Sequence, residues 1–351
     1  MQYRELADSG IDVSEVGFGA WTVGTDWWGD RDESDAIEMM EYALEQGITY
    51  FDTGDVYGHG RSEELVGKVL AEHDDMVVAT KVGYDFYDNP QAGHGELPKN
   101  LSPAYIRDAV EGSLERLGTD HVEYLQLHNA NVEEITPDVL EVLDELREED
   151  RFDALGLALG PSIGWLAEGD FAIEQEFDGV QYVGNLLEQD IHQHFVDSVR
   201  ESGASTSLIP RVPHSSGLLN EQVTPETELE AGDHRGFRPD EWYETGWEKV
   251  DALRFLERDG ERTMGQAAIQ WLLSFDEVAS VTPTFRSKAD VDEWARTPDT
   301  PRLSDEERER IAELYADNFG VDRFDGMSKE DYRTSVDGDD LRDAGLVGTA
   351  D

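Results

Sequence analysis

Short apolar runs alternate with longer amphipathic segments along most of this chain. The runs are rich in Val, Ile, Leu, Phe and Tyr and are bounded by turn residues, which is the pattern of buried strands. They lie at residues 16–18, 49–51, 77–79, 124–127, 154–157, 179–182, 207–209 and 279–281. The sequence therefore predicts eight strands.

The segments between these runs have the apolar spacing of helices. They cover residues 35–46, 62–72, 103–117, 137–149, 163–176, 191–201, 247–258 and 263–274. Ser102 and Pro103 suit a helix start, and Gly47, Gly118 and Gly203 follow predicted helix ends. Alternating units of this kind predict an α/β fold, a closed parallel (β/α)8 TIM barrel, with a doubly wound open sheet as the alternative.

Three segments fall outside this alternation. Residues 3–6 and 11–13 predict an amino-terminal hairpin. Residues 214–245 are rich in Gly, Pro and charge and predict an active-site loop after the seventh strand. Beyond the eighth strand, residues 303–316 predict a carboxyl-terminal helix.

The predicted organisation is one barrel followed by a tail. A chain of 351 residues can form one large core or two smaller ones, and the alternation favours a single barrel over residues 1–320. Residues 321–351 form an acidic polar tail. We expect this tail to be either disordered or packed on the barrel.

The charge of the chain is strongly negative. Asp and Glu total 80 against 28 Lys and Arg, which gives a formal net charge of −52, and the acids are spread over the whole chain. Apolar residues still make up 38% of the sequence, so the composition is not that of a disordered protein. Self-repulsion of this size is tolerated where concentrated salt shortens the Debye length to about 3 Å at 1 M. The composition predicts a halophilic protein, with an ordinary acidic protein as the alternative.

Composition also excludes several kinds of site and partner. The chain has no cysteine, so disulfides, zinc thiolate sites and thiol catalysis are excluded. His192 and His194 lack the i, i+4 spacing of a helical metal pair, so no metal site is predicted. The negative charge disfavours nucleic acid and anionic membranes as partners. Because the sequence shows neither a leader nor a membrane-spanning apolar stretch, we expect a cytoplasmic protein with a small-molecule substrate; its oligomeric state stays open.

Four polar side chains follow apolar runs that are neighbours in the predicted barrel. Asp52, Lys81 and His128 close the second, third and fourth strands, and Tyr57 lies in the loop after Asp52. Adjacent strands are about 5 Å apart, and the loops at their carboxyl ends build the active site of such a barrel. We therefore expect these four side chains to meet.

The four groups suit proton transfer to a carbonyl oxygen. An ammonium stabilises a phenolate, so Lys81 would lower the pKa of Tyr57 from its ordinary value of about 10. Asp52 would keep Lys81 charged, and His128 would donate a hydrogen bond to the carbonyl oxygen. Each residue alone has an ordinary explanation as a cap, a packed aromatic or a strand-end group, so the hypothesis rests on their combination.

The chain resembles the aldo-keto reductase superfamily in the order and spacing of several motifs. These motifs are residues 13–21, 51–58, 62–67, 80–81 and 125–128. The catalytic Asp, Tyr, Lys and His of that family fall on Asp52, Tyr57, Lys81 and His128, and the likeness covers about residues 1–320. The resemblance implies a (β/α)8 barrel that binds NADPH, or less often NADH, without a Rossmann domain.

The same resemblance implies most of a cofactor site. Gln181 matches a glutamine that contacts the nicotinamide amide, and Arg211 matches the residue that packs on the nicotinamide ring. Gly217 and Leu218 lie in the counterpart of the pyrophosphate loop. Where the family has Ser and Asn after the fifth strand, this chain has Ala and Leu at 158–159, so two polar anchors are missing.

Residues 281–287 resemble the segment that binds the adenosine phosphate. Arg286 keeps a cation there, whereas Asp290 and Trp294 replace a basic or amide residue and an asparagine. Arg286 favours NADP(H) over NAD(H). Asp290 acts in the opposite sense, because a carboxylate repels a 2′-phosphate and can accept a hydrogen bond from a ribose hydroxyl. We expect NADP(H) to be favoured.

Three tryptophans, Trp21, Trp27 and Trp28, follow the first predicted strand. An aromatic loop at the barrel mouth could form one wall of a substrate pocket. Packing into the core is the alternative.

The sequence therefore predicts an NAD(P)(H)-dependent enzyme that reduces an aldehyde or ketone to the alcohol, or catalyses the reverse, with Tyr57 supplying the proton. Two alternatives use the same barrel. One is a slow-turnover, redox-sensing regulatory protein, as are the potassium-channel auxiliary subunits that resemble this family. The other is an isomerase or epimerase with the phenol as base, which would need no net cofactor oxidation.

Overall fold

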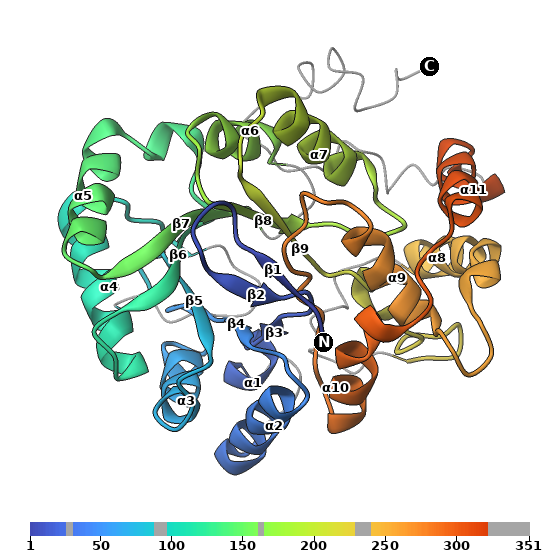
Figure 1. Ribbon diagram of the computed structural model, residues 1–351, viewed down its shortest axis with the longest axis horizontal. Coiled ribbons are helices and arrows are strands. Elements are labelled where there is room, and N and C mark those ends of the chain that lie inside the picture. The colour runs from blue at the N-terminus through green and yellow to red at the C-terminus, as the bar shows by residue number, and fades with distance from the viewer. Residues whose placement is uncertain (26–30, 88–96, 161–164, 229–239, 322–351) are drawn as a thin grey trace.

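A parallel sheet in chain order forms the centre of the molecule (Figure 1). The computed structural model of the chain describes residues 1–25, 31–87, 97–160, 165–228 and 240–321. The strands of the sheet are β3 (Phe18–Gly19), β4 (Tyr50–Asp52), β5 (Val77–Val82), β6 (Val122–His128), β7 (Phe152–Ala158), β8 (Gly179–Val183) and β9 (Ser207–Arg211).

Backbone bridges close this sheet into a barrel. They join two pairs beside β9 and one pair just before β3, all parallel: Leu208 with Val278, Arg211 with Thr282, and Val16 with Val281. The eighth predicted strand therefore lies in its expected place between the last strand and the first. Its pairing consists of isolated bridges and not of a continuous ladder, and with this difference the predicted (β/α)8 barrel is confirmed.

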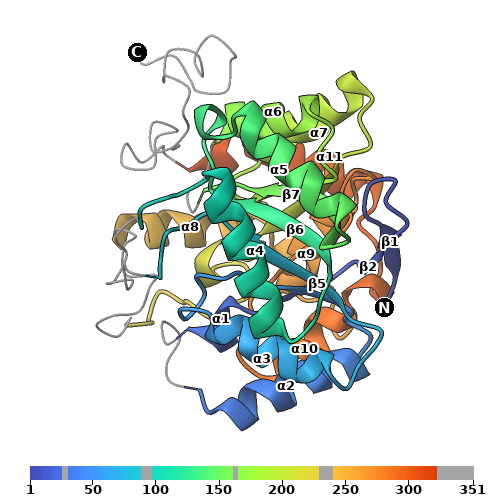
Figure 2. The same cartoon turned by 90° about the vertical axis from the view of Figure 1, so that its left-hand side faces the viewer.

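Helices surround the barrel (Figures 1 and 2). They are α1 (Trp21–Gly24), α2 (Glu33–Glu45), α3 (Arg61–Leu70), α4 (Pro103–Leu117), α5 (Pro137–Glu148), α6 (Leu166–Glu174), α7 (Asp190–Ser202), α8 (Asp240–Ala252), α9 (Met264–Leu273), α10 (Lys288–Ala295) and α11 (Asp305–Ala316). Pro103 opens α4, and Gly118 and Gly203 end α4 and α7 with a left-handed φ of 70°. These are the start and stop signals that the sequence analysis used.

An antiparallel hairpin covers the amino-terminal end of the barrel. It consists of β1 (Tyr3–Glu5) and β2 (Asp12–Ser14), as predicted, and lies in front of the barrel in Figure 1. Leu6 and Val13 from the hairpin pack on the barrel interior, where they meet Tyr50 and Tyr124. These aromatic residues precede the ends of β4 and β6, so the hairpin closes the end of the barrel opposite the predicted site.

The barrel interior holds a large aromatic ring because two neighbouring strands carry glycine. The ring of Tyr124 is fully buried. A Cβ added at Gly156 would lie 1.9 Å from the Tyr124 hydroxyl oxygen, and one at Gly179 would lie 2.4 Å from the same atom. Neither position has room for a side chain.

Three helices differ from the prediction, and one of them, the short α1, lies where the sequence predicted a loop. Helix α8 begins at Asp240, inside the predicted loop 214–245, and ends at Ala252, before the predicted end of the helix at 258. Gly246 lies inside α8, and a side chain there would collide with Leu218, because an added Cβ would be 2.5 Å from it. Helix α10 was not predicted, although Ser287 and a carboxylate three residues later form its capping box.

Within the described residues, no helix combines the length and the apolar character needed to cross a bilayer. The predicted tail, beyond Val321, lies outside the described residues.

Candidate active site

A buried ion pair joins the ends of β4 and β5. The Nζ atom of Lys81 lies 2.6 Å from Oδ1 of Asp52 and donates a second hydrogen bond to the carbonyl oxygen of Thr53 at 2.7 Å. The Lys81 side chain has no exposed surface. An ammonium has three protons to donate, and fixed acceptors take two of them. One remains for a further partner above the strand ends.

The loop after β4 places the side chain of Tyr57 at this position. The Lys81 nitrogen lies 4.9 Å from the centroid of the Tyr57 ring, and the imidazole of His128 meets the same ring edge-on at 5.7 Å. Both ends of the loop are fixed, because Thr53 Oγ1 donates to Ser62 Oγ at 2.7 Å and the backbone N–H of Ser62 donates to the Tyr57 carbonyl oxygen at 3.1 Å. The structure thus brings together the four side chains that the sequence analysis expected to meet.

The environment separates the charge states of Lys81 and His128. Burial alone would lower the pKa of Lys81, but the Asp52 carboxylate and the Tyr57 phenol outweigh it, and the pKa is raised. Burial, and then the charges of Lys81 and Arg211, hold the pKa of His128 well below its ordinary value. At neutral pH the site therefore contains an ammonium beside the phenol and a neutral imidazole.

The neutral imidazole of His128 has one proton to place. Its Nδ1 atom is buried and has no hydrogen-bond partner in the described part of the chain. Because a buried donor without an acceptor is rarer than a buried acceptor without a donor, we assign the proton to Nε2. From Nε2 this proton can be donated to a bound oxygen atom.

Two glutamines complete the hydrogen bonding of Asp52. Gln126 and Gln181 donate to Oδ2 of Asp52 at 3.1 and 2.8 Å. Gln181, which was predicted to contact the nicotinamide amide, uses one N–H of its amide on Asp52, so its second N–H and its oxygen are left for a cofactor. Gln126 was not predicted as a site residue, because one polar residue in a strand-like run carries no signal of its own.

The end of β7 carries apolar side chains, and the end of β9 carries the cation of Arg211. Ala158 and Leu159 are buried at the end of β7, so the two missing anchors have no polar replacement at those positions. Arg211, at the end of β9, donates from Nη2 to the carbonyl oxygens of Leu159 at 3.0 Å and Gly160 at 2.6 Å. The guanidinium is thereby fixed beside these positions.

A model of the aldo/keto reductase family matches residues 15–316 of this chain. The chain belongs to the aldo/keto reductase family. It is 30% identical over 288 residues to aldo-keto reductase YhdN of Bacillus subtilis, covering 78% of this chain and 81% of that protein. Two solved structures extend the likeness: the holo form of aldo-keto reductase AKR11C1 from Bacillus halodurans (TM-score 0.73, 28% identity, 90% of this chain and 96% of that one) and glycerol dehydrogenase AKR11B4 from Gluconobacter oxydans (TM-score 0.75, 25% identity, 90% and 95%).

Membership in the aldo/keto reductase family makes this protein an NAD(P)-dependent oxidoreductase of carbonyl compounds. The segments predicted to hold the cofactor lie together in this structure. Ser215, Ser216 and Gly217 form a left-handed turn after β9, with φ values of 47°, 54° and 97°. Arg286 Nη1 lies 3.4 Å from Oε1 of Gln222, so the loop after β9 meets the start of α10. This donor set of cations and an amide suits an anionic cofactor that carries a carboxamide.

Asp290 has a structural task in this aldo/keto reductase. Its Oδ2 atom accepts the backbone N–H groups of Arg286 at 2.7 Å and Ser287 at 3.0 Å, which caps α10. If Asp290 also accepts a hydrogen bond from a ribose hydroxyl, as predicted, the same carboxylate must serve both the cofactor and the start of the helix.

Aromatic side chains stand beside the predicted catalytic groups. Tyr84 meets His128 edge-on at 4.9 Å and packs with Phe86 and Val56 next to Tyr57. These aromatic residues were not predicted as part of the site, although those at 84–87 follow directly after β5, just as the predicted pocket tryptophans follow the first strand. Of those, Trp21 begins α1 and is partly buried, while Trp27 and Trp28 lie outside the described residues.

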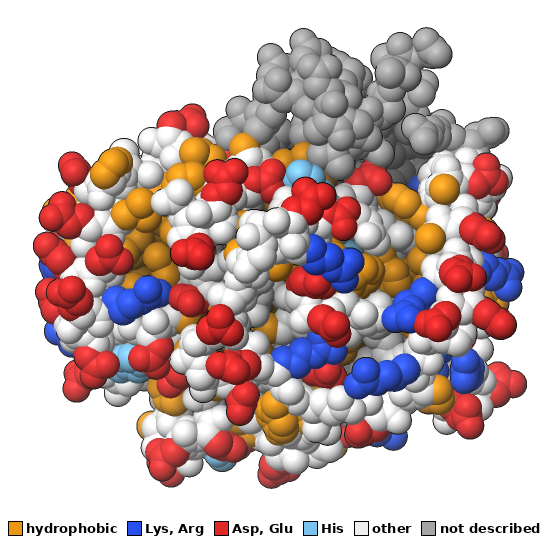
Figure 3. Space-filling model, turned by 45° about the horizontal axis from the view of Figure 1, so that its top comes forward, with side chains coloured by type: hydrophobic (Ala, Val, Ile, Leu, Met, Phe, Trp, Pro, Cys, Tyr) orange, Lys and Arg blue, Asp and Glu red, His pale blue; other side chains and the backbone are white. Residues whose placement is uncertain are grey.

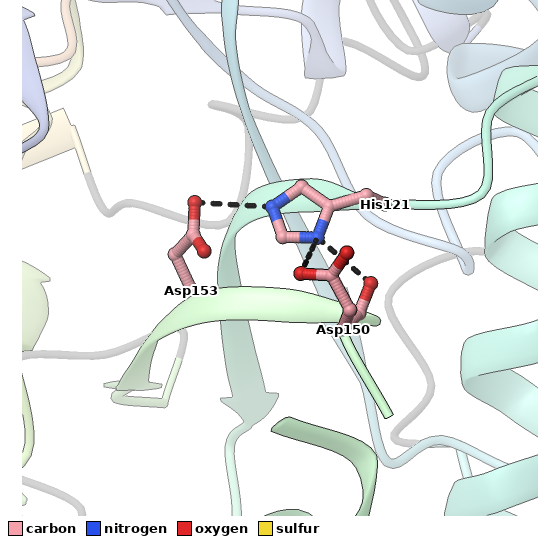
Figure 4. A group of neighbouring side chains, drawn as sticks. All are labelled: His121, Asp150 and Asp153. Carbon is pink, nitrogen blue, oxygen red and sulfur yellow. Dashed lines mark hydrogen bonds and ion pairs between the residues drawn. The ribbon is translucent and has the colours of Figure 1, made fainter. Parts of the chain in front are cut away.

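At the opposite end of the barrel, His121 lies between Asp150 and Asp153 (Figure 4). Its Nδ1 is 2.9 Å from the backbone oxygen of Asp150, and its Nε2 is 3.0 Å from a carboxylate oxygen of Asp153. A metal ligand needs a free lone pair on one ring nitrogen, but both nitrogens of this ring face oxygen acceptors. The arrangement fits an imidazolium that donates on both sides.

This arrangement predicts a pH-dependent contribution of His121 to stability. Partial burial alone would lower the pKa of His121, but the hydrogen bonds to Asp150 and Asp153 outweigh it, and the pKa is raised. A raised pKa in the folded state stabilises the protein below the unfolded pKa of about 6.5, and this stabilisation is lost as the pH rises through the folded value. His121→Gln should therefore lower the free energy of unfolding more at acidic than at alkaline pH.

Denaturant unfolding at constant molar KCl, at two pH values on either side of this window, measures the difference. Asp153→Asn should reduce it by removing the negative charge next to Nε2 of His121. His73→Gln is the matched control, since the His73 ring makes no ion pair within the described residues. An equal loss at both pH values for His121→Gln would contradict the prediction.

Proposed function

We propose that this protein reduces an aldehyde or ketone to the alcohol, or catalyses the reverse, with Tyr57 as the proton donor. The observation that carries the proposal is the position of Lys81, which is ion-paired with Asp52 at 2.6 Å and lies 4.9 Å from the Tyr57 ring. An ammonium at this place stabilises the phenolate that remains after the proton has left.

Each residue of the site has a separate role in the proposed reduction. The reduced nicotinamide, when bound, supplies the hydride to the carbonyl carbon. The hydroxyl of Tyr57 gives its proton to the carbonyl oxygen, and Lys81 compensates the negative charge that forms on the phenol. His128 donates a hydrogen bond from Nε2 to the same carbonyl oxygen and orients it toward Tyr57. Tyr84 and Phe86 keep water from one side of the reacting atoms.

We propose NADP(H) as the favoured cofactor. Arg286 stands at the start of α10, where a guanidinium can bind a phosphate through paired hydrogen bonds. Asp290 opposes this preference through its charge, but its carboxylate accepts two backbone N–H groups at the helix start, which restrains its position. Gln181, Arg211, Gly217 and the adjacent Leu218 complete the proposed cofactor site, with Trp21, Trp27 and Trp28 as proposed pocket residues.

We further propose that the protein works in the cytoplasm at a high salt concentration. Its residues 1–320 would form one barrel, and residues 321–351 a separate tail. Acidic side chains are spread over the visible face of the molecule and outnumber the basic groups among them (Figure 3). Acids outnumber bases by 80 to 28 in the whole sequence. A surface of this kind disfavours nucleic acid as a partner and leaves a small carbonyl compound as the substrate.

Tyr57→Phe should lower kcat about 10²–10⁴-fold, the usual contribution of a general acid, and leave cofactor affinity within about twofold. The reason is that the phenol acts on the carbonyl oxygen and not on the cofactor. Steady-state oxidation of NADPH with 4-nitrobenzaldehyde in molar KCl measures kcat, and quenching of tryptophan fluorescence measures the dissociation constant.

Tyr50→Phe is the matched control. Tyr50 is buried in β4, the strand that leads into the Tyr57 loop, and its hydroxyl has no hydrogen-bond partner within the described residues. Activity of Tyr57→Phe within about tenfold of the parent would sink the assignment. Slow turnover by the parent enzyme itself would favour the regulatory alternative.

Arg286→Ala should weaken the binding of NADPH by about tenfold to a hundredfold and that of NADH much less, since only NADPH carries the 2′-phosphate. Dissociation constants for both cofactors at one fixed salt concentration measure the difference. Arg296→Ala, at the other end of α10, is the control for a lost surface charge. Equal losses for the two cofactors would show that Arg286 does not bind the 2′-phosphate.

Salt should raise both the melting temperature and the activity up to molar KCl. Screening also weakens surface ion pairs, such as that of Arg107 with Glu149 at 2.9 Å, but acids exceed bases so strongly that repulsion dominates. Thermal unfolding between low and molar KCl tests this, with sucrose as an uncharged control for solvent exclusion. A melting temperature that does not change with salt would refute the halophilic interpretation.

A further inference from the structure

Strand β6 presents three side chains to the barrel interior at three depths. Tyr124 lies lowest among the apolar residues that the hairpin covers, and His128 lies highest beside Tyr57. Gln126 lies between them, paired in register with Lys81 of β5, and has no exposed surface. Gln126 is therefore directly beneath the proposed site and out of reach of substrate and cofactor.

The amide of Gln126 has one hydrogen bond, and that bond goes to Asp52. Its nitrogen donates to Oδ2 at 3.1 Å, while its oxygen is buried and accepts no hydrogen bond within the described residues. A buried polar atom without a partner is destabilising. An apolar side chain of the same size would avoid this cost, so stability alone does not explain an amide at this position.

The carboxylate of Asp52 needs donors on both oxygens to keep one orientation. Lys81 binds Oδ1, and Gln126 and Gln181 bind Oδ2 from two other strands. The two amides prevent the carboxylate from turning about its last single bond, so Oδ1 stays on Lys81. The ammonium in turn stays below the Tyr57 ring.

We propose that Gln126 is a positioning residue of the reaction: its amide holds the Asp52 carboxylate in the orientation that keeps Lys81 beneath Tyr57. This inference rests on the proposed role of Tyr57 as proton donor. Gln126 acts through Asp52 and Lys81, and Gln181 gives the same support from the side of the proposed cofactor site.

Few other groups near Gln126 can change charge in the working pH range. Burial raises the pKa of Tyr50 and of Tyr124 well above the ordinary value, and burial lowers that of His128. These three groups therefore stay neutral around neutral and alkaline pH. Two charged groups also face the site: burial raises the pKa of Asp55, whose backbone N–H donates to the Lys81 carbonyl oxygen at 3.2 Å, and burial lowers the pKa of Arg211. Both are present in every variant, so a shift of the pH profile that Gln126→Met shows and a control variant lacks is due to the lost bond between Gln126 and Asp52.

Gln126→Met removes the donor and nearly keeps the volume. Its kcat with NADPH and 4-nitrobenzaldehyde should fall by about tenfold to a hundredfold, the loss expected for a hydrogen bond to a charged group, while the KM for the aldehyde and the cofactor dissociation constant stay within about twofold. The alkaline limb of the kcat profile should move to higher pH, because a phenolate that loses its ammonium is less stable.

Gln126→Glu separates positioning from packing. At low pH a protonated glutamic acid can donate to Oδ2 of Asp52 as the amide does, so activity should approach that of the parent enzyme. As the pH rises this glutamate ionises beside a second carboxylate, the donor is lost, and activity should fall well before that of the parent does. A purely structural role predicts no such rescue.

Tyr124→Phe is the matched control, since it changes the same strand and the same interior face at a hydroxyl without a partner in the described residues. It should keep the parent kcat and pH profile. The proposal is overturned if Gln126→Met has the parent kcat, or if its kcat falls together with its melting temperature while the alkaline limb stays in place.

A crystal structure of Gln126→Met tests the positioning without reference to turnover. The proposal expects a turned Asp52 carboxylate and a Lys81 nitrogen farther from the Tyr57 ring, and an unchanged arrangement of these groups would overturn it. A fully active Tyr57→Phe would refute the proposed function alone, so the two failures are distinguishable.

Discussion

A fully buried ammonium needs a fully hydrogen-bonded carboxylate, and the polar interior of this barrel is arranged to provide one. Removal of either partner of a buried pair leaves a charge without compensation, which is far more costly than the loss of a surface pair. Asp52 and Lys81 therefore tie β4 to β5, and the two glutamines on Oδ2 extend the tie to β6 and β8. The same bonds that satisfy the buried charges also aim Lys81 at the Tyr57 loop.

The two ends of the barrel have different tasks. At the amino-terminal end, the hairpin residues Leu6 and Val13 and the ring of Tyr124 fill the interior with apolar contacts. At the carboxyl-terminal end, the interior is polar and the loops carry chemistry, as in other barrels of this type. The ion pair of Lys81 lies at the boundary, so the apolar layer beneath it excludes water from the charges and strengthens their attraction.

The sequence predicted the barrel and the meeting of Asp52, Tyr57, Lys81 and His128, because the strand pattern indicates which residues end neighbouring strands and Tyr57 follows one of those ends in the next loop. It could not predict which atoms would bond. Gln181 is 129 positions from Asp52 and was expected to serve a cofactor, yet its nitrogen reaches the carboxylate across the barrel. The start of α8 was missed as well, because the close packing of Gly246 against Leu218 is a tertiary contact that no local pattern encodes.

An anionic cofactor and a strongly acidic protein are compatible because the cations of the protein are paired in two ways. On the surface, guanidinium groups meet carboxylates, as Arg107 does with Glu145 and Glu149, and their charge is cancelled locally. Arg211 instead donates to backbone carbonyl oxygens and has no carboxylate in an ion pair with it within the described residues, so its full charge acts at the strand ends. Salt screens the distant surface acids over about 3 Å at 1 M, but a partly buried cation in direct contact with a ligand is screened much less. Concentrated salt thus removes the repulsion and leaves the attraction.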